Sequence, residues 1–306
     1  MLQDLIGIAA IARAAILELF HKTQLDERFP SRSPPPEVNE RVRRTVASWD
    51  LGIPTEIYEP YLTCGIDIGY AAYRHTSYDV QVAISLYTFC ATLYDDAIID
   101  LDTMRKFPLS LYAGQPQPHP LLHYFMEKTL DLRQYYPPYA ANAICSGTLE
   151  YANAEILARE GADDMSIRPN ATQYVEYFRS KGGVAEPYAV FMWPSTVCSD
   201  PLSYVQAIPD AMNFINLLND VFSFYKEAIN GETGNYINKY AQAHAKSIED
   251  AVQDAVHKVV QSAERVRGIL CMGPARDAWE EFASGYAHFH LYCKRYRLVE
   301  VVPEYF

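Results

Sequence analysis

The 306-residue chain has few cysteines, and none of them lies close to another in the sequence. The six cysteines stand at positions 64, 90, 145, 198, 271 and 293, and no Cys-x-x-Cys pair occurs. This spacing excludes a disulfide framework and a cysteine-based zinc site, and it is typical of reduced thiols in the cytoplasm. We therefore expect a cytoplasmic protein.

Long hydrophobic runs are also absent. No stretch reaches the roughly 18 uncharged apolar residues that a membrane-spanning helix needs. The most apolar stretch runs from Leu5 to Phe20, and Arg13 and Glu18 interrupt it. It lacks the charged leader and the small-residue cleavage site of a signal peptide. This pattern predicts an amphipathic surface helix and no membrane span.

Positive charge is scarce. The chain has 26 Lys and Arg against 38 Asp and Glu, which gives a net charge of −12. Proteins that bind nucleic acid neutralise phosphates with Lys and Arg, so this balance argues against a nucleic-acid partner. An acidic protein that binds an anionic substrate needs metal cations or a local cluster of basic residues.

Alternating strand patterns are rare, and most apolar residues instead recur at helical spacing. The length allows one large core or at most two modest domains. We expect one all-α domain over residues 1–306, in which residues 1–36 form a peripheral N-terminal segment. Helices are predicted at 4–22, 37–50, 55–73, 78–100, 119–132, 137–160, 170–180, 184–195, 203–229, 236–268 and 275–298.

The first candidate site lies in the helix predicted at 203–229. Asn219, Ser223 and Glu227 follow one another at four-residue intervals, so their side chains share one face of the helix. An amide, a hydroxyl and a carboxylate are hard oxygen donors that suit Mg²⁺. Lys226 is within reach of a phosphate bound to that metal. A solvated polar face is the alternative, but the flanking residues are strongly apolar.

The second candidate is the acidic pair Asp95-Asp96, which ends a long apolar stretch and precedes Asp100. Carboxylates are disfavoured at a helix C-terminus, so a positive group should compensate them, and Mg²⁺ would do so. A solvated acidic helix end is the alternative.

Two basic elements complete the pattern. Arg295-Tyr296 offers a guanidinium fork and a hydroxyl for phosphate oxygens, although a basic helix end also satisfies the helix dipole. Arg179 precedes Gly182-Gly183, and two glycines in a helical pattern indicate a break that exposes backbone carbonyls. A plain turn between helices explains these glycines equally well.

In this order, the four elements resemble the class I terpene cyclases, most closely the fungal trichodiene synthase-like sesquiterpene cyclases. Residues 95–100 (DDAIID) are similar to the aspartate-rich motif of that family, and residues 219–227 (NDVFSFYKE) are similar to its second metal motif. Arg295-Tyr296 resembles its terminal Arg-Tyr pair. The spacing fits as well, with 124 residues from Asp95 to Asn219 and 76 from Asn219 to Arg295.

The resemblance implies a single-domain α-helical bundle with a deep central active-site pocket. It implies Mg²⁺-dependent cyclisation of farnesyl diphosphate to a sesquiterpene hydrocarbon or alcohol, with diphosphate as the co-product. Asp95 would bind two of three Mg²⁺ ions, with Mn²⁺ as an alternative ion, and Asp96 would belong to the same metal site. The third ion would be held by Asn219, Ser223 and Glu227.

The resemblance also implies roles for the basic elements. The diphosphate would be bound by Arg179, Lys226, Arg295 and Tyr296. The backbone carbonyl of Gly183 would help to trigger ionisation, with Gly182 as the linker to Arg179. The linker is often acidic in bacterial relatives, so this chain departs from that pattern.

A carbocation needs a pocket without nucleophiles, and aromatic faces can stabilise it by cation–π contact. Our candidate pocket-lining residues are Phe89, Trp193, Phe222, Tyr286, Phe289 and Tyr292. For each of these aromatics, ordinary core packing is the alternative.

Two other readings stay open. An all-trans prenyltransferase would also be all-α, but it would normally carry a second aspartate-rich motif in place of Asn219, Ser223 and Glu227. A non-catalytic helical protein that binds isoprenoid diphosphates is the other alternative. A preference for C15 over C10 or C20 substrates rests on family analogy. The product and the oligomeric state are open, a homodimer included.

Overall fold

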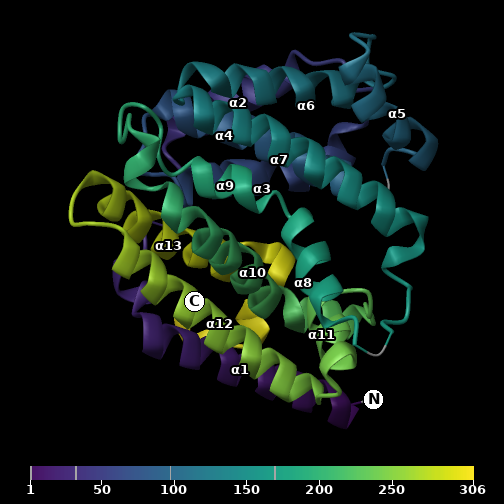
Figure 1. Ribbon diagram of the computed structural model, residues 1–306, viewed down its shortest axis with the longest axis vertical. Coiled ribbons are helices and arrows are strands. Elements are labelled where there is room, and N and C mark those ends of the chain that lie inside the picture. Colours follow the sequence, from purple (N-terminus) through teal and green to yellow (C-terminus); the bar gives the residue numbers. More distant parts are fainter. Residues whose placement is uncertain (1, 32, 97, 169) are drawn as a thin grey trace.

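The computed structural model describes residues 2–31, 33–96, 98–168 and 170–306, and these ranges contain thirteen α-helices and no strand (Figure 1). The helices are α1 (Leu2–Thr23), α2 (Pro36–Ala47), α3 (Thr55–Ala71), α4 (Tyr78–Asp95), α5 (Leu101–Tyr112), α6 (Pro120–Asp131), α7 (Pro138–Leu157), α8 (Thr172–Lys181), α9 (Ala185–Val190), α10 (Ile208–Asn230), α11 (Tyr236–His244), α12 (Ile248–Ile269) and α13 (Pro274–Tyr292). Short 3₁₀ and π turns join them, among them η1 (Leu25–Arg28), the π turn η3 (Ala158–Ala162) and η6 (Lys294–Tyr296). The all-α prediction is confirmed.

Capping residues explain where the predicted helices were wrong. The helix expected at 78–100 ends at Asp95, because Asp100 caps a separate helix, α5, by accepting a hydrogen bond from the Thr103 amide at 2.9 Å. The helix expected at 236–268 is two helices, because Ser247 caps α12 by accepting from the Asp250 amide at 3.1 Å.

Other boundaries moved without changing the number of elements. The helices expected at 137–160, 184–195, 203–229 and 275–298 span 138–157, 185–190, 208–230 and 274–292. The shortest of them, α9, stops several residues before Pro194, which disfavours helical conformation in the residue ahead of it.

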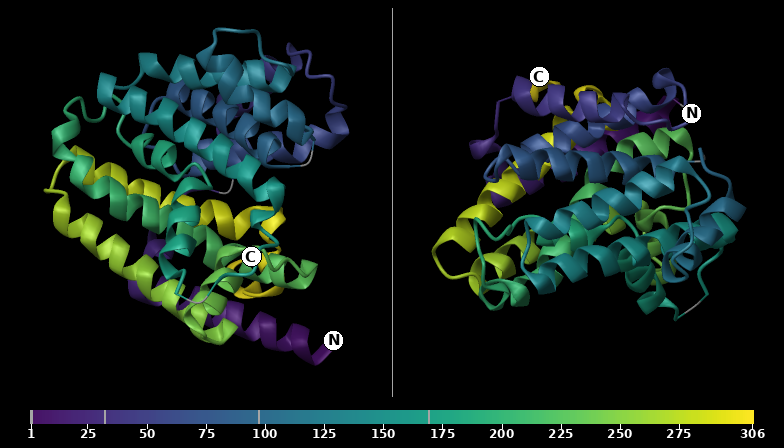
Figure 2. Two further views of the ribbon diagram at one scale, coloured as in Figure 1. Left: turned by 45° about the vertical axis from the view of Figure 1, so that its right-hand side comes forward. Right: turned by 90° about the horizontal axis from the view of Figure 1, so that it is seen from above.

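The helices form two groups that α10 joins (Figures 1 and 2). In the upper group of Figure 1, α3 packs along α4, α4 also contacts α2 and α6, and α7 contacts α9. In the lower group, α12 lies between α1 and α10, and α13 runs beside α10. Because α10 contacts α9, α12, α1 and α13, its side chains can reach both the core and the space between the two groups.

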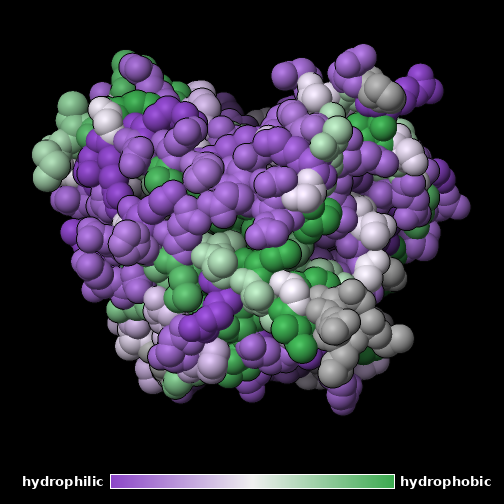
Figure 3. Space-filling view, turned by 90° about the horizontal axis from the view of Figure 1, so that it is seen from below, coloured by the Kyte–Doolittle hydropathy of each residue, from purple (hydrophilic) through white to green (hydrophobic). Residues whose placement is uncertain are grey.

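The N-terminal helix α1 lies on the outside of the bundle but contributes to its core. Its inner face buries Ala12, Ile16, Leu19 and Phe20 against α10 and α12. Its outer face is also partly apolar, since Ile6 is 65 % exposed. Seen from below, the surface is mostly hydrophilic, with one band where hydrophobic side chains gather (Figure 3). In the described part of the chain, none of the helices combines the length and apolarity of a membrane span.

A close approach sets the position of α13. A Cβ atom at Gly285 would lie 1.8 Å from the carbonyl oxygen of Ala71, at the end of α3. A residue larger than glycine would therefore push α13 away from α3 and widen the space that these helices enclose with α10.

Candidate active site

A cavity of about 650 Å³ opens where the two groups of helices meet. Side chains from α3, α4, α7, α8, α10 and α13 form its walls, and the loop 231–235 lies at its mouth. The mouth is polar and charged, whereas the deeper walls are mainly apolar. Cavities of this size that combine apolar walls with a few convergent polar groups are typical of small-molecule sites.

One wall of the mouth comes from α10. Asn219, Ser223, Lys226 and Glu227 all line the cavity, as their shared helix face predicted. Ser223 is 2 % exposed, and its Oγ atom has no hydrogen-bond partner among the described residues. Buried hydroxyls usually have a partner, so this oxygen is suited to a ligand bound in the cavity.

The opposite wall brings together two carboxyl groups from α4 and α7. Asp95 lies on the cavity wall and shares a hydrogen bond with Glu155 of α7. Burial and the charge of Asp95 raise the pKa of Glu155 well above its usual value. Two carboxylates that face each other repel when both are ionised, and a divalent cation between them would relieve that repulsion. The sequence motifs gave no signal for Glu155.

Arg159 supplies the positive group that the end of α4 requires. Its guanidinium donates hydrogen bonds to the carbonyl oxygens of Tyr94 at 3.2 Å, Asp95 at 2.9 Å and Ile99 at 2.8 Å, and also to that of Asp96. The carbonyls of Tyr94 and Asp95 lie at the negative end of the α4 dipole, so a cation here is favourable. We had expected Mg²⁺ to compensate this helix end, and Arg159 shares that role.

The second aspartate of the pair faces elsewhere. Asp96 follows the end of α4 with an extended backbone, and the Tyr61 hydroxyl of α3 donates a hydrogen bond to its carboxylate. Asp96 is not on the cavity wall, and Asp100 caps α5. Of the pair, Asp95 alone lines the cavity, and the assignment of Asp96 to the metal site stays a prediction.

Arg179 is held at the mouth by a buried ion pair that the sequence did not reveal. Its Nε atom donates to both carboxylate oxygens of Asp220, at 2.9 and 3.1 Å, and its Nη2 atom donates to the Asn216 carbonyl at 2.9 Å. Burial raises the pKa of Asp220 to about 6 against the opposing effect of Arg179, so the partner cation keeps this carboxylate charged near neutral pH. The side-chain amide of Asn216 in turn donates a hydrogen bond to the Arg179 carbonyl oxygen at 3.2 Å.

The helical conformation is interrupted between α8 and α9, next to this arginine. Gly183 has a φ of 76°, and a Cβ atom there would lie 2.6 Å from the Arg179 guanidinium and 3.1 Å from Asn216 Oδ1. Glycine is therefore required for both conformation and space. Val184 follows with a φ of 55°, which costs a β-branched residue about 1–3 kcal/mol. The break expected at these glycines is thus a strained bend on the cavity wall.

The C-terminal segment closes another side of the mouth. Arg295 and Tyr296 lie on the cavity wall, in the 3₁₀ turn η6 rather than in the last helix as expected. The Tyr296 hydroxyl accepts a hydrogen bond from the Asn219 amide at 3.2 Å. The structure thus gathers Arg179, Lys226 and Arg295 as three cationic side chains around one opening.

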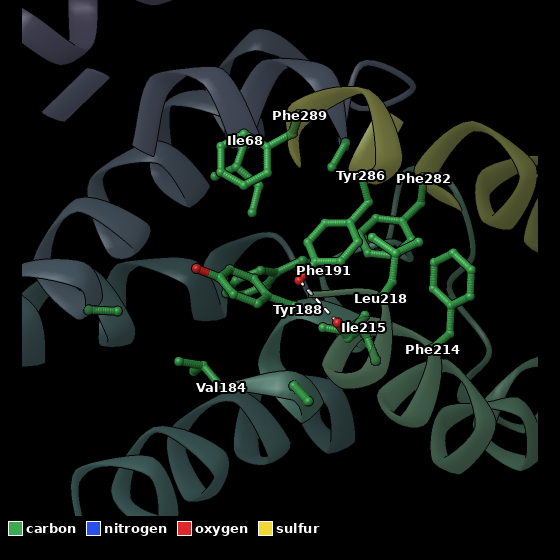
Figure 4. Close-up of a cluster of buried hydrophobic side chains, with 14 of the residues drawn as sticks. Ile68, Val184, Tyr188, Phe191, Phe214, Ile215, Leu218, Phe282, Tyr286 and Phe289 are labelled. Atoms are coloured by element: carbon green, nitrogen blue, oxygen red, sulfur yellow. Dashed lines mark hydrogen bonds between the residues drawn. The ribbon is translucent and has the colours of Figure 1, made fainter. Parts of the chain in front are cut away.

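The deeper part of the cavity is aromatic (Figure 4). Tyr286 and Phe289 of α13 line it as predicted, and Tyr188 of α9 is a third aromatic wall residue. Both tyrosine hydroxyls are engaged: Tyr286 donates to the Ile215 carbonyl at 3.3 Å, and Tyr188 donates to the Thr88 hydroxyl at 3.1 Å. These hydrogen bonds hold the two tyrosine side chains in place, and their rings, like that of Phe289, are available for cation–π contact.

Four of the predicted pocket-lining aromatics do not line the cavity, and two of them pack within the hydrophobic core. Phe89 of α4 packs against Trp49 and Tyr58, at ring distances of 6.1 and 5.8 Å. Trp193 stacks on Tyr204 at 4.5 Å. Both rings are fully buried in the core, which was the alternative for each.

The other two face the N- and C-terminal segments. Phe222 of α10 points away from the metal-motif face and meets Phe20 of α1 edge-on at 5.8 Å. Tyr292, the last residue of α13, donates its hydroxyl hydrogen to the Tyr305 carbonyl at 2.9 Å. Neither ring lines the cavity.

The donor set at the mouth fits a hard divalent cation. In the described residues, no group of three His, Cys, Asp or Glu side chains gathers as a metal site. The oxygen donors instead include the amide of Asn219 and the free hydroxyl of Ser223, together with the carboxylates of Glu227 and Asp95. Such oxygen-only sites, completed by a ligand's own oxygens, are typical of Mg²⁺.

The sequence and the fold both match known proteins. The family model described as trichodiene synthase (TRI5) matches residues 62–305. Monoterpene synthase 25 from Postia placenta is 34 % identical over 95 % of this chain and 87 % of its own length. Longiborneol synthase CLM1 from Gibberella zeae is 33 % identical over 73 % of this chain and 68 % of its own length. The crystal structure of a linalool/nerolidol synthase from Streptomyces clavuligerus has a TM-score of 0.65 and 15 % identity, and the match covers 85 % of this chain and 98 % of that one. The resemblance and the terpene synthase fold are confirmed.

Proposed function

The chain belongs to the trichodiene synthase (TRI5) family of terpene synthases, and from this premise we propose that it is a Mg²⁺-dependent sesquiterpene cyclase that acts on farnesyl diphosphate. The observation that carries the proposal is the α10 face at the mouth of an aromatic cavity. There Asn219 and Glu227 flank a buried Ser223 hydroxyl that has no partner in the described part of the chain.

Two walls of the mouth support binding of divalent cations and diphosphate. Asn219, Ser223 and Glu227 would hold one ion, and Asp95 would hold others with help from Glu155. Mg²⁺ bound there would neutralise charge that develops on the departing diphosphate, and three ions are the number that the family resemblance implies. Mn²⁺ is an alternative ion.

The cationic side chains would bind the diphosphate and stabilise it as it leaves. Arg179 is fixed by Asp220, so its guanidinium needs little rearrangement to meet a phosphate oxygen. Lys226 and Arg295 approach the same opening from α10 and η6. Charges that are already in position before the reaction are the main source of electrostatic catalysis. The Gly183 carbonyl, at the strained bend beside Arg179, is our candidate for the trigger of ionisation.

Loss of diphosphate leaves an allylic cation that must be kept from water. The rings of Tyr286, Phe289 and Tyr188 on the cavity wall would stabilise it by cation–π contact, and the enclosed cavity would keep water away. The cyclic product then depends on the conformation that these walls impose on the hydrocarbon chain of the substrate.

The choice of a C15 substrate is the finer part of the proposal. Longiborneol, named in one relative, is a C15 alcohol, whereas a monoterpene synthase, named in another, makes C10 products. The cavity of about 650 Å³ is large enough to hold the longer chain together with the diphosphate. The six free cysteines support the cytoplasmic location that we propose.

Family membership argues against both alternatives from the sequence. A prenyltransferase would need a second aspartate-rich motif where α10 carries Asn219 and Ser223. A protein that only binds isoprenoid diphosphates would not need the full set of oxygen donors for metal ions next to an aromatic cavity wall.

The test is product analysis of purified protein incubated with Mg²⁺ and geranyl, farnesyl or geranylgeranyl diphosphate separately. We expect a cyclic C15 product from farnesyl diphosphate, and none when a chelator removes the metal. A cyclic product from geranyl diphosphate alone would overturn the chain length but keep the reaction class. No terpene from any of the three would refute the proposal.

Matched variants connect the activity to the α10 face. Asn219→Ala and Glu227→Ala should abolish turnover while leaving the melting temperature within a few degrees. Asn230→Ala, an exposed position at the end of the same helix, should keep wild-type turnover. Full activity in Asn219→Ala would refute the metal assignment.

A further inference from the structure

His290 lies on the cavity wall next to Asn219, and the proposed chemistry gives it no role. It belongs to α13 and is completely buried. Its Nε2 atom is 3.0 Å from the amide nitrogen of Asn219, and its Nδ1 atom is 2.8 Å from the Tyr286 carbonyl oxygen. The ring therefore links a candidate metal ligand to the backbone of the helix that forms the aromatic wall.

The hydrogen-bond partners define which nitrogen carries the proton. A carbonyl oxygen can only accept, so Nδ1 of His290 must donate to Tyr286. In a neutral ring the other nitrogen is then an acceptor. The ring is completely buried, where an unpaired positive charge is strongly disfavoured, so the neutral form is the one that fits these contacts.

This tautomer in turn defines the orientation of the Asn219 amide. The NH₂ group has two hydrogens, and it finds two acceptors, His290 Nε2 at 3.0 Å and the Tyr296 hydroxyl at 3.2 Å. With both hydrogens used, Oδ1 points the other way, and its neighbour there is the Arg179 guanidinium at 3.4 Å. Rotating the amide by half a turn would place Oδ1 against the acceptor nitrogen of His290, which is repulsive.

A metal ion can use only the oxygen of an asparagine side chain. A rotated amide would direct its NH₂ group toward the cation and remove one of the donors on the α10 face. We propose that His290 is a positioning residue that holds the Asn219 amide with its oxygen toward the metal site. This inference rests on the proposed function, because it assumes that Asn219 is a metal ligand.

The first test measures metal binding rather than turnover. Mn²⁺ is titrated into the protein in the presence of inorganic diphosphate, and bound metal is followed by electron paramagnetic resonance. His290→Phe keeps a ring but removes the acceptor, and we expect about 10–100-fold weaker Mn²⁺ binding. His290→Gln can place its amide oxygen near the Nε2 position, and we expect it to restore most of the affinity.

The matched control is His288→Phe. His288 lies two residues away on the same helix, is also buried at 5 % exposure, and packs against Phe29 and Tyr292. We expect this variant to bind Mn²⁺ as the wild type does. Wild-type affinity in His290→Phe would overturn the positioning role, as would a His290→Gln variant that melts like the wild type but binds metal as weakly as His290→Phe. Wild-type protein that binds no Mn²⁺ would instead refute the metal site itself.

A second test needs only the wild-type protein and one variant for assignment. Nitrogen-15 NMR of histidine-labelled protein distinguishes the two neutral tautomers, and the signals of His290 are those that His290→Gln lacks. We expect Nδ1 to carry the hydrogen and Nε2 to be an unprotonated acceptor. A hydrogen on Nε2 would overturn the inference even if His290→Phe does not fold.

Discussion

Removing the Arg159 guanidinium should loosen the segment that presents Asp95 to the cavity. One side chain donates to four carbonyl oxygens at and after the end of α4. In Arg159→Leu these carbonyls lose a charged donor that no other described side chain replaces. Hydrogen bonds to charged groups contribute about 1.5–3 kcal/mol each. Because Arg159 is half-buried, water can replace part of this, and we expect a total of about 3 kcal/mol rather than the sum of four bonds.

The loss of stability should be confined to the end of α4 and the residues after it, because the four carbonyls belong to this short segment. A local opening that is about 3 kcal/mol easier speeds amide exchange by roughly 100-fold. Hydrogen exchange with mass spectrometry should show this in the peptide that follows α4 and much less in α10. Arg159→Lys should show an intermediate effect, since an ammonium group cannot spread over four carbonyls as a guanidinium does.

The control is Arg105→Leu. Arg105 is close in space but exposed, and its partners among the described residues are Asp102 and Glu160. Its exchange pattern should match that of the wild type. If Arg159→Leu exchanged like the wild type in this segment and bound Mn²⁺ with diphosphate equally well, the proposed role of the guanidinium would be refuted.

Further substitutions test three other parts of the site. Asp220→Ala leaves Arg179 as an unpaired buried charge and should lower the free energy of unfolding by about 3–5 kcal/mol, as read by urea denaturation; an unchanged midpoint would contradict the ion pair. Ser223→Ala removes a hydroxyl that has no partner among the residues that the structure describes, so it should raise the Mg²⁺ concentration needed for half-maximal activity without lowering the melting temperature. Phe289→Leu, on the cavity wall, should change the product distribution, whereas Phe222→Leu should keep the products and cost about 1 kcal/mol of stability. Identical product profiles for Phe289→Leu and the wild type would argue against an aromatic wall at this position.

The α10 face was predictable because its information is local. Asn219, Ser223 and Glu227 recur at the period of one helix, so their convergence needs no knowledge of the fold. The Arg-Tyr pair and Arg179 were placed by the family resemblance, and the structure brings both to the same opening.

The supporting residues were not predictable, because their partners are distant in the sequence. Glu155 and Arg159 meet the end of α4 only after α7 packs against it, and His290 meets Asn219 only after α13 packs against α10. No motif marks these positions, and a lone buried histidine or glutamate has many alternative explanations.

The aromatic predictions failed for a different reason. Helix α4 is covered by α2, α3 and α6, so apolar periodicity does not tell which of its sides faces the cavity, and the Phe89 ring packs against Trp49 and Tyr58 instead. Along α13, helical spacing correctly predicted that Tyr286 and Phe289 line the cavity. It was wrong for Tyr292, because the helix ends there and the ring turns toward the C-terminal segment.

The most direct test of the account is an anomalous difference map from crystals of this protein grown with Mn²⁺ and inorganic diphosphate. Diphosphate-bound manganese should appear at the mouth of the cavity, with one peak in contact with Asn219 Oδ1, Ser223 Oγ and the Glu227 carboxylate, and another beside Asp95. Manganese peaks only at other sites, or a bound diphosphate with no metal on the α10 face, would contradict the central claim that this mouth is a metal-dependent diphosphate site.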